Sequence, residues 1–384
     1  MICFISACNN DSVSDKQAES FLKYYAVGID NTGTEVIQTS DGYAIMGNFE
    51  NGSGQKDIFI IFTDEFGRQK TGDPIIIGTD DDDHGYSMIR LGDGYLISGT
   101  SFNETQKWGY LVNISSDGRV LWEQNYSGYQ ELEFRDAYEA NDGNLIMTGY
   151  SIRNPGDDME AIIAKTSTTG ELKWLRTNNF SGRNDVGEAI IEHQKRYHVL
   201  TTSTNVSDIN LSRIRMLNTD TKGRAPTNYE IKIDYLSGKD ITKITPEGNM
   251  YILGNNEDPA SRVSSIFLGE LELISEGQIT TLKNSASIPY TESLHAESFA
   301  PVEQKNELAI GGWQVKPNDN DILFLSVDIG FQDFMLKTYG SKGYQASQNI
   351  IYTGDGGFAL TGSVDLADGR ISMLLKIDSD GELR

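Results

Sequence analysis

A unit of about 50 residues recurs along this chain, and the repeat limits the possible folds more than any other feature of the sequence. Each copy has a tight turn, a short apolar segment, a variable loop, a second apolar segment and a glycine turn. The first turns are separated by 52, 49, 53, 52, 58 and 50 residues and fall at Asp41-Gly42, Asp93-Gly94, Asp142-Gly143, Lys195-Arg196, Glu247-Gly248, Lys305-Asn306 and Asp355-Gly356.

The apolar segments read as strands. Those after the first turns are YAIMG, YLISG, NLIMTG, YHVLT, NMYILG, ELAIG and FALTG. The second set lies at 57–62, 108–114, 161–165, 212–217, 265–271, 321–327 and 372–377. Short apolar runs bounded by turn residues are typical of strands that are buried on both faces. Four strands in each of seven copies predict 28 strands.

A period near 50 residues with four strands per copy matches the blade of a β-propeller. We therefore predict an all-β fold, a seven-bladed β-propeller with four antiparallel strands per blade, as a single domain over residues 21–384. The last copy ends at Glu382-Leu383-Arg384 without a fourth strand, whereas FLKYYAVG at 21–28 precedes the first copy. We expect residues 21–28 to pair with the 372–377 strand and close the ring, because an open ring exposes unpaired strand edges.

Two copies carry a further pattern, Asp117-Gly118-Arg119-Val120-Leu121-Trp122 and Thr169-Gly170-Glu171-Leu172-Lys173-Trp174. With the repeat itself, it resembles the propellers of Bacteroidota lipoproteins and, more distantly, the blades of quinoprotein-like propellers. The resemblance implies blade geometry. It implies no quinone cofactor, because only two of the seven copies have the tryptophan.

The N-terminal residues resemble a bacterial lipoprotein signal. Ile5-Ser6-Ala7-Cys8 matches an apolar residue, two small residues and the cysteine that receives the lipid, and a polar stretch follows. We expect residues 1–8 to be a signal segment with its true start upstream, and residues 9–20 to be a tether. Within it, Asp11-Ser12-Val13 resembles the O-glycosylation signal of Bacteroidota, on Ser12. The alternative is an ordinary buried N-terminus.

The charge of the chain excludes one class of partner. Its 32 basic and 56 acidic residues give a net charge of −24, which repels phosphate backbones, so we expect no nucleic-acid ligand. No run of 18 apolar residues is present, and membrane attachment is expected through the lipid alone. Cys3 and Cys8 are the two cysteines, so the body of the chain has no thiol to form a disulfide.

The variable loops are the expected place for a site. The longest, at 48–56, 100–107, 151–160 and 255–263, should share one face of the ring, and loops on a rigid scaffold commonly carry binding residues. Aromatic rings beside acids and amides suit a sugar. The candidate ligand-binding residues are Trp108, Tyr129, Phe134, Tyr290, Trp313 and Tyr344. The alternative is that these rings pack the blades.

One loop has four successive carboxylates, Asp80, Asp81, Asp82 and Asp83, and oxygen ligands of this kind are those that calcium takes. The alternative is a solvated acidic loop, and no other cofactor is expected. The four histidines share no ligand spacing, and neither a His-Glu-x-x-His nor a Gly-x-Ser-x-Gly motif is present. These absences favour a function other than catalysis.

Three functions are compatible with these features. The first is a lipid-anchored propeller of the outer membrane, at the cell surface, that binds a glycan or a partner protein of a surface complex. The second is a polysaccharide-active enzyme, a hydrolase or a lyase, because opposed carboxylates are compatible with 56 acidic residues. The third is a periplasmic factor of outer-membrane assembly. The shape and chemistry of the long-loop face should separate them.

Overall fold

A computed structural model describes residues 20–70, 72–274, 277–288, 291–366 and 369–383. Its regular structure is almost entirely strand, with one short 3-10 turn, η1 (Glu303–Lys305). Among these residues, no helix has the length and apolar character needed to cross a membrane. The expected all-β fold is therefore confirmed.

The strands follow one another in groups of four. Group 1 contains β2 (Ile29–Gln38), β3 (Gly42–Glu50), β4 (Lys56–Asp64) and β5 (Ile75–Ile77). Group 2 contains β6 (Asp82–Leu91), β7 (Gly94–Phe102), β8 (Lys107–Ile114) and β9 (Val120–Tyr126). Group 3 contains β10 (Glu131–Glu139), β11 (Leu145–Ile152), β12 (Glu160–Thr166) and β13 (Leu172–Asn178). Group 4 contains β14 (Arg183–His193), β15 (Arg196–Asn205), β16 (Asp208–Asp220) and β17 (Thr227–Glu230).

Group 5 contains β18 (Leu236–Lys243), β19 (Met250–Glu257), β20 (Ser264–Leu273) and β21 (Ile279–Ile288). Group 6 contains β22 (Leu294–Val302), β23 (Glu307–Lys316), β24 (Asp319–Asp328) and β25 (Phe334–Tyr339). Group 7 combines the two ends of the chain: β26 (Gln345–Tyr352), β27 (Phe358–Leu366), β28 (Gly369–Ile377) and β1 (Phe21–Tyr25).

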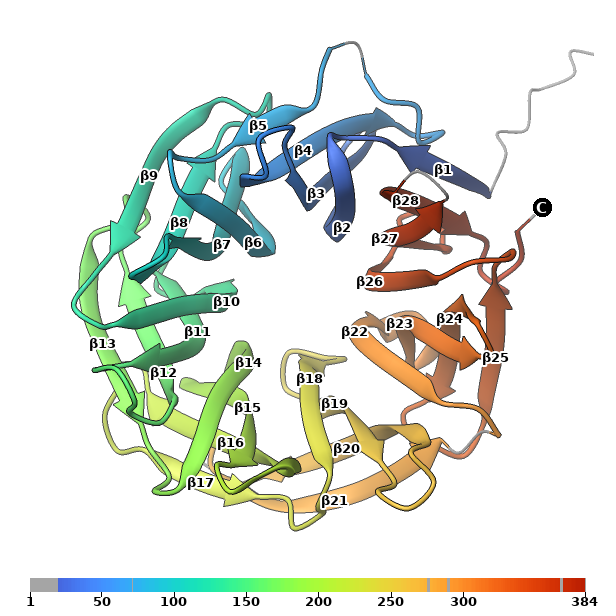
Figure 1. Cartoon of the computed structure of the whole chain (residues 1–384). Coiled ribbons are helices and arrows are strands. Elements are labelled where there is room, and N and C mark those ends of the chain that lie inside the picture. The colour runs from blue at the N-terminus through green and yellow to red at the C-terminus, as the bar shows by residue number, and fades with distance from the viewer. Residues whose placement is uncertain (1–19, 71, 275–276, 289–290, 367–368, 384) are drawn as a thin grey trace, which may run out of the picture.

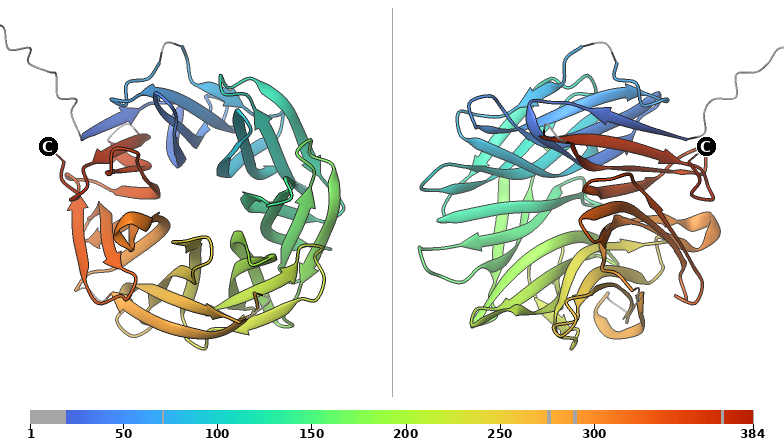
Figure 2. Two further views of the ribbon diagram at one scale, coloured as in Figure 1. Left: turned by 180° about the vertical axis from the view of Figure 1, so that it is seen from behind. Right: turned by 45° about the vertical axis from the view of Figure 1, so that its right-hand side comes forward.

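Each group is an antiparallel sheet in which successive strands pair, and the groups surround a central axis, with the first strand of each group innermost (Figure 1). Groups 2 and 3 join into one eight-stranded sheet through a single parallel bridge between Lys107 of β8 and Glu131 of β10. Seen from behind and from the side, the groups keep this arrangement around the axis (Figure 2).

The N-terminal strand pairs with the C-terminal one. Phe21 lies opposite Lys376 and Tyr25 opposite Ser372, in antiparallel register. The strand is shorter than the expected segment 21–28, because it ends at Tyr25; Val27 is nevertheless buried. An apolar cluster covers this joint, containing Tyr25, Val36 and Phe59 from the start of the chain and Ala359 and Leu374 from its end.

Among the described residues, a tyrosine hydroxyl donates to a glycine carbonyl of the neighbouring group at three places. Tyr126 of β9 donates to the carbonyl of Gly170 in group 3 at 2.6 Å, and Tyr339 of β25 donates to that of Gly381 at 2.5 Å. Tyr25 of β1 makes the same bond to Gly67 of group 1 at 2.7 Å. We call this contact the tyrosine lock; it joins β1 to group 1 as it joins groups elsewhere.

The accepting glycine of each lock has little space for a side chain. Gly67 has a φ of +69°, and a Cβ there would lie 2.4 Å from the Phe21 ring. A Cβ at Gly170 would similarly meet the indole of Trp122 at 2.9 Å. The tryptophan of the Asp-Gly-x-x-x-Trp pattern therefore packs on the glycine turn of the next group.

Candidate functional site

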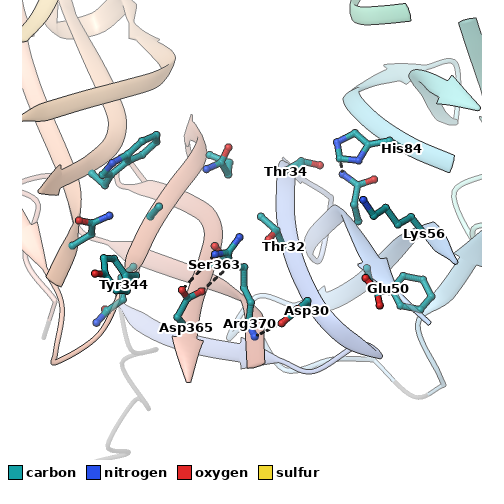
Figure 3. A pocket seen from close by; sticks show the side chains of 17 residues that line it. Asp30, Thr32, Thr34, Glu50, Lys56, His84, Tyr344, Ser363, Asp365 and Arg370 are labelled. Carbon is teal, nitrogen blue, oxygen red and sulfur yellow. Dashed lines mark hydrogen bonds and ion pairs between the residues drawn. The ribbon is translucent and has the colours of Figure 1, made fainter. Parts of the chain in front are cut away.

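A cavity of about 760 Å³ opens on the face that carries the β3–β4 and β27–β28 connections, which is the long-loop face. We call it the seam cavity, because it lies between groups 7 and 1, where the two ends of the chain meet (Figure 3). Its volume is within the range of ordinary ligand pockets. Its walls are Asp30, Thr32, Thr34, Asn48, Phe49, Glu50, Lys56, His84, Trp313, Asn320, Tyr344, Gln345, Ala346, Gln348, Ser363, Asp365 and Arg370.

Hydrogen bonds between groups 1 and 7 fix one wall of the seam cavity. The Arg370 guanidinium donates to both carboxylate oxygens of Asp365, at 2.6 and 3.4 Å, and the Arg370 backbone N–H donates to Asp30 at 2.9 Å. Behind them, the buried Asn31 side chain accepts from Ser372 N–H at 2.8 Å. A two-pronged arginine–carboxylate contact has a fixed geometry, so this wall is rigid and charged.

Besides the buried Phe49, the aromatic rings of Tyr344 and Trp313 line the cavity. Tyr344 is 51% exposed at the start of group 7. Trp313 lies near the end of β23, and its indole stacks on the His295 ring with centroids 5.0 Å apart and planes 15° apart. Such rings offer flat apolar surfaces among groups that donate and accept hydrogen bonds.

His84 lies on the opposite side of the cavity, beside the Asn48 amide at 3.3 Å and the Tyr86 ring at 4.5 Å. Burial lowers the pKa of His84 to about 4, so its imidazole is neutral at neutral pH. It can therefore donate one hydrogen bond and accept another without adding charge to the site.

The bottom of the site is the central channel, where a cavity of about 300 Å³ is lined by the first strands of the groups. Every first strand has a β-bulge at the same place in its group. The extra residues all line this cavity: Thr34, Tyr86, Arg135, Glu188, Lys239, Glu297 and Gln348. Bulges redirect side chains, and here the repeat directs one per group toward the axis.

The charged bulge residues neutralise one another. Arg135 pairs with Glu188 at 2.7 Å and with Glu133 at 2.9 Å, while Lys239 pairs with Glu297 at 2.9 Å. The bulge residues that line the channel thus form ion pairs between adjacent groups.

In several groups the residue after the bulge is bonded to the next group. Asp136 accepts from Ile190 N–H at 2.8 Å and Asp240 from Phe299 N–H at 2.9 Å. Asn349 makes the equivalent bond to Val36 N–H at 3.3 Å, from group 7 to group 1. Burial raises the pKa of Asp136 to about 6, and burial together with the Asp136 charge raises that of Asp240 to about 7.

Of the six ring residues predicted from the sequence, Trp313 and Tyr344 line the seam cavity. Phe134 was a wrong prediction, because it is fully buried against Tyr126 in the core between groups 2 and 3. Tyr129 packs on the same core beneath Arg153, and Trp108 lies in β8 opposite Ser101; neither reaches this cavity. Tyr290 lies outside the described residues.

The predicted calcium ligands Asp80–Asp83 do not converge in the structure: the described residues contain no group of three or more acids, histidines or cysteines placed to hold a metal. Side chains that alternate along a strand diverge. Asp83 is buried and accepts from Thr79, Asp82 accepts from Lys56 N–H, and Asp81 accepts from Asn103. Cys8 and Ser12 lie outside the described residues.

The other residues that line the seam cavity were not predicted from the sequence; among them, Asp30, His84, Asp365 and Arg370 lie near the ends of strands. The bulges were not predicted either, although a signal was available. A glycine precedes the bulge in four of the first strands, at Gly33, Gly85, Gly187 and Gly238.

The fold is similar to that of known β-propellers. The propeller domain of the Trilobed protease from Pyrococcus furiosus, described as having an open velcro topology, matches with a TM-score of 0.52 and 8% identity over 93% of this chain and 95% of that one. YCF48 bound to D1 peptide matches with a TM-score of 0.52 and 12% identity over 94% and 96%. Polysaccharide lyase Uly1 matches with a TM-score of 0.53 and 10% identity over 93% and 92%.

No family model matches the chain. At these identities the structural likeness shows the fold alone, which is a β-propeller.

Proposed function

We propose that this chain is a seven-bladed propeller closed by β1, and that it is a lipid-anchored glycan-binding module of the outer membrane, displayed at the cell surface. The blade count is supported by the groups of four strands, and the closure by the β1–β28 pairing and the Tyr25 lock. The anchor rests on the sequence around Cys8.

The chemistry of the seam cavity carries the glycan proposal. Two rings, Trp313 and Tyr344, border a cavity whose other walls are mostly amides, hydroxyls and carboxylates. A sugar presents C–H faces to rings and hydroxyls to such polar groups. The Arg370 guanidinium and the Asp365 carboxylate satisfy each other, and this favours recognition over proton transfer.

Other functions are candidates besides glycan binding. The similarity to polysaccharide lyase Uly1 and to YCF48 bound to D1 peptide makes an enzyme or a peptide binder the next candidates, but each likeness is of fold. A protein partner in a surface complex and a role in outer-membrane assembly are the others. Release of new reducing ends from a bound oligosaccharide would identify an enzyme.

The test is binding of the full chain to an array of neutral and acidic oligosaccharides, followed by calorimetry on those that bind. Replacing the rim ring in Tyr344→Ala should weaken binding by about tenfold, since burying such a side chain is worth ~1.5–3 kcal/mol. Phe334→Ala is the matched control, because Phe334 has the same 51% exposure on the outer strand β25. Absence of binding, or equal affinities for the two variants, would contradict the proposal.

A further inference from the structure

A second cavity, of about 400 Å³, lies beside the seam cavity, over groups 4, 5 and 6. Its walls again combine rings with polar groups, among them Tyr235, Asn255 and His295. Tyr235 has a φ of +61° and Arg262 a φ of +59°. A bulky residue in this backbone region is uncommon and is often found where a side chain must be presented to a ligand.

The two cavities share one wall. Trp313 lines both, and the His295 ring on which it stacks lines the second. Both cavities also open toward the channel, because Thr34 and His84 line the seam cavity and the channel, whereas Lys239 and Glu297 line the second cavity and the channel. The two cavities therefore both border the indole and the channel.

The charged side chains of the two cavities disfavour an acidic ligand. In the second cavity Lys239 is paired with Glu297 at 2.9 Å and Arg262 with Glu257 at 3.5 Å, and Asp208 adds a further carboxylate. The seam cavity likewise has more acidic than basic side chains, and its Arg370 is paired. A polyuronate would approach unbalanced carboxylates in a chain that already carries a net charge of −24.

We infer that the seam cavity and the second cavity are two subsites for one neutral, linear polysaccharide, whose chain crosses the Trp313–His295 stack. The inference rests on the proposed function and extends it, since it specifies the length and the charge class of the glycan. A ligand that fills both subsites gains the second set of contacts at a high effective concentration.

The test uses calorimetry of the full chain with cello-, manno- and xylo-oligosaccharides from disaccharide to hexasaccharide, and with oligogalacturonates. The preferred neutral hexasaccharide should bind about tenfold or more tightly than its disaccharide. Tyr235→Asn removes the ring of the second cavity and inserts a residue that tolerates positive φ. It should reduce hexasaccharide affinity to the disaccharide level and leave disaccharide affinity unchanged, whereas Tyr344→Ala should weaken both.

The outcomes separate the two ideas. If no oligosaccharide binds, the proposed function fails and this inference fails with it. If binding depends on Tyr344 but not on chain length, or if Tyr235→Asn has no effect on the hexasaccharide, the inference alone is overturned. Tighter binding of oligogalacturonates than of every neutral chain would overturn the charge class. Matched melting temperatures establish that each variant is folded.

Discussion

Asp136 and Asp240 are carboxyl groups whose pKa values are raised by burial in the folded protein. Each accepts a backbone N–H of the following group, and each lies at the channel next to a bulge. Their raised pKa values mean that the folded protein holds protons there that the unfolded chain has released. Glu35 faces the same channel, and burial raises its pKa in the same direction.

These raised pKa values predict that the carboxyls contribute more stability as the pH falls from 8 to about 6.5. Below about 6.5 the histidines act in the opposite direction, because burial lowers the pKa of His84, His193, His198 and His295 in the folded protein. The folded pKa of Asp240 is about 7, above its ordinary value of 3.8. The contribution of Asp240 to stability is therefore fully present at low pH and is lost as the pH rises through 7. Each such proton contributes a slope of up to about 1.4 kcal/mol per pH unit.

Urea denaturation across this range measures the slope. Asp240→Asn keeps an oxygen to accept from Phe299 N–H and should flatten it, whereas Glu104→Gln, in an exposed loop, should not. An unchanged slope in Asp240→Asn would contradict the assignment.

The ring residues show how far the sequence can identify a site. Trp313 and Tyr344 were predicted because they lie in or beside variable loops, and both line the cavity. Phe134 has the same local sequence character, but it precedes a bulge, and the bulge sets which neighbouring side chains face the core. Single-residue register of this kind depends on tertiary pairing, so sequence pattern alone does not determine it.

Among the secondary-structure elements, β1 makes two contacts that join the ends of the chain. It adds the fourth strand to group 7, and through the tyrosine lock it also joins that group to group 1. The repeat period and the missing last strand made this pairing predictable, since a fourth strand had to come from elsewhere. The seam cavity was not predictable in the same way, because it is assembled from strand ends far apart in sequence.

Deletion of residues 20–28 should therefore destabilise the protein strongly. It removes the rings of Phe21 and Tyr25 from packed positions, at ~1.5–3 kcal/mol each, from a total stability that is typically ~5–15 kcal/mol. It also leaves the β28 edge unpaired, which promotes aggregation. The measurement is the melting temperature, with deletion of residues 9–19 as the control that should leave it nearly unchanged.

A finer variant isolates the lock from the strand. Tyr25→Phe removes only the hydroxyl that donates to Gly67 and should cost about 1 kcal/mol. The matched variant Tyr126→Phe removes the same bond between groups 2 and 3. Similar costs would show that the joint at β1 is equivalent to an internal joint; no loss in Tyr25→Phe, or equal melting temperatures for the two deletions, would show that β1 does not hold the ring together.

At the scale of the whole molecule, inter-group hydrogen bonds link the groups around the axis. Asp136, Asp240, Ser298 and Asn349 each accept a backbone N–H from the group that follows. The last of these connects group 7 to group 1, so the same bond that joins internal groups also occurs where the two ends of the chain meet. The repeat in the sequence predicted the groups. The bonds between them depend on the bulges, for which the sequence offered a signal in four copies, the glycines at Gly33, Gly85, Gly187 and Gly238.

A further prediction concerns the location of the protein in the cell, which we expect to depend on Cys8. Produced with a complete signal peptide, the natural chain should fractionate with the outer membrane, because a lipid on Cys8 would anchor it through the polar stretch that follows. Cys8→Ala should move the protein to the soluble fraction. Cys3→Ser is the control and should leave it membrane-bound; retention of Cys8→Ala in the membrane would contradict the anchor.

The position of the seam cavity has a consequence for biosynthesis. Asp30 and Thr32 are among the first described residues to be made, while Ser363, Asp365 and Arg370 are among the last, and one cavity needs both. A ribosome-bound chain that lacks its final strands has no complete seam cavity, however well its earlier groups have folded. If a ligand must fill this cavity, binding is acquired only when groups 7 and 1 have met, and capture of that ligand would distinguish finished molecules from incomplete ones.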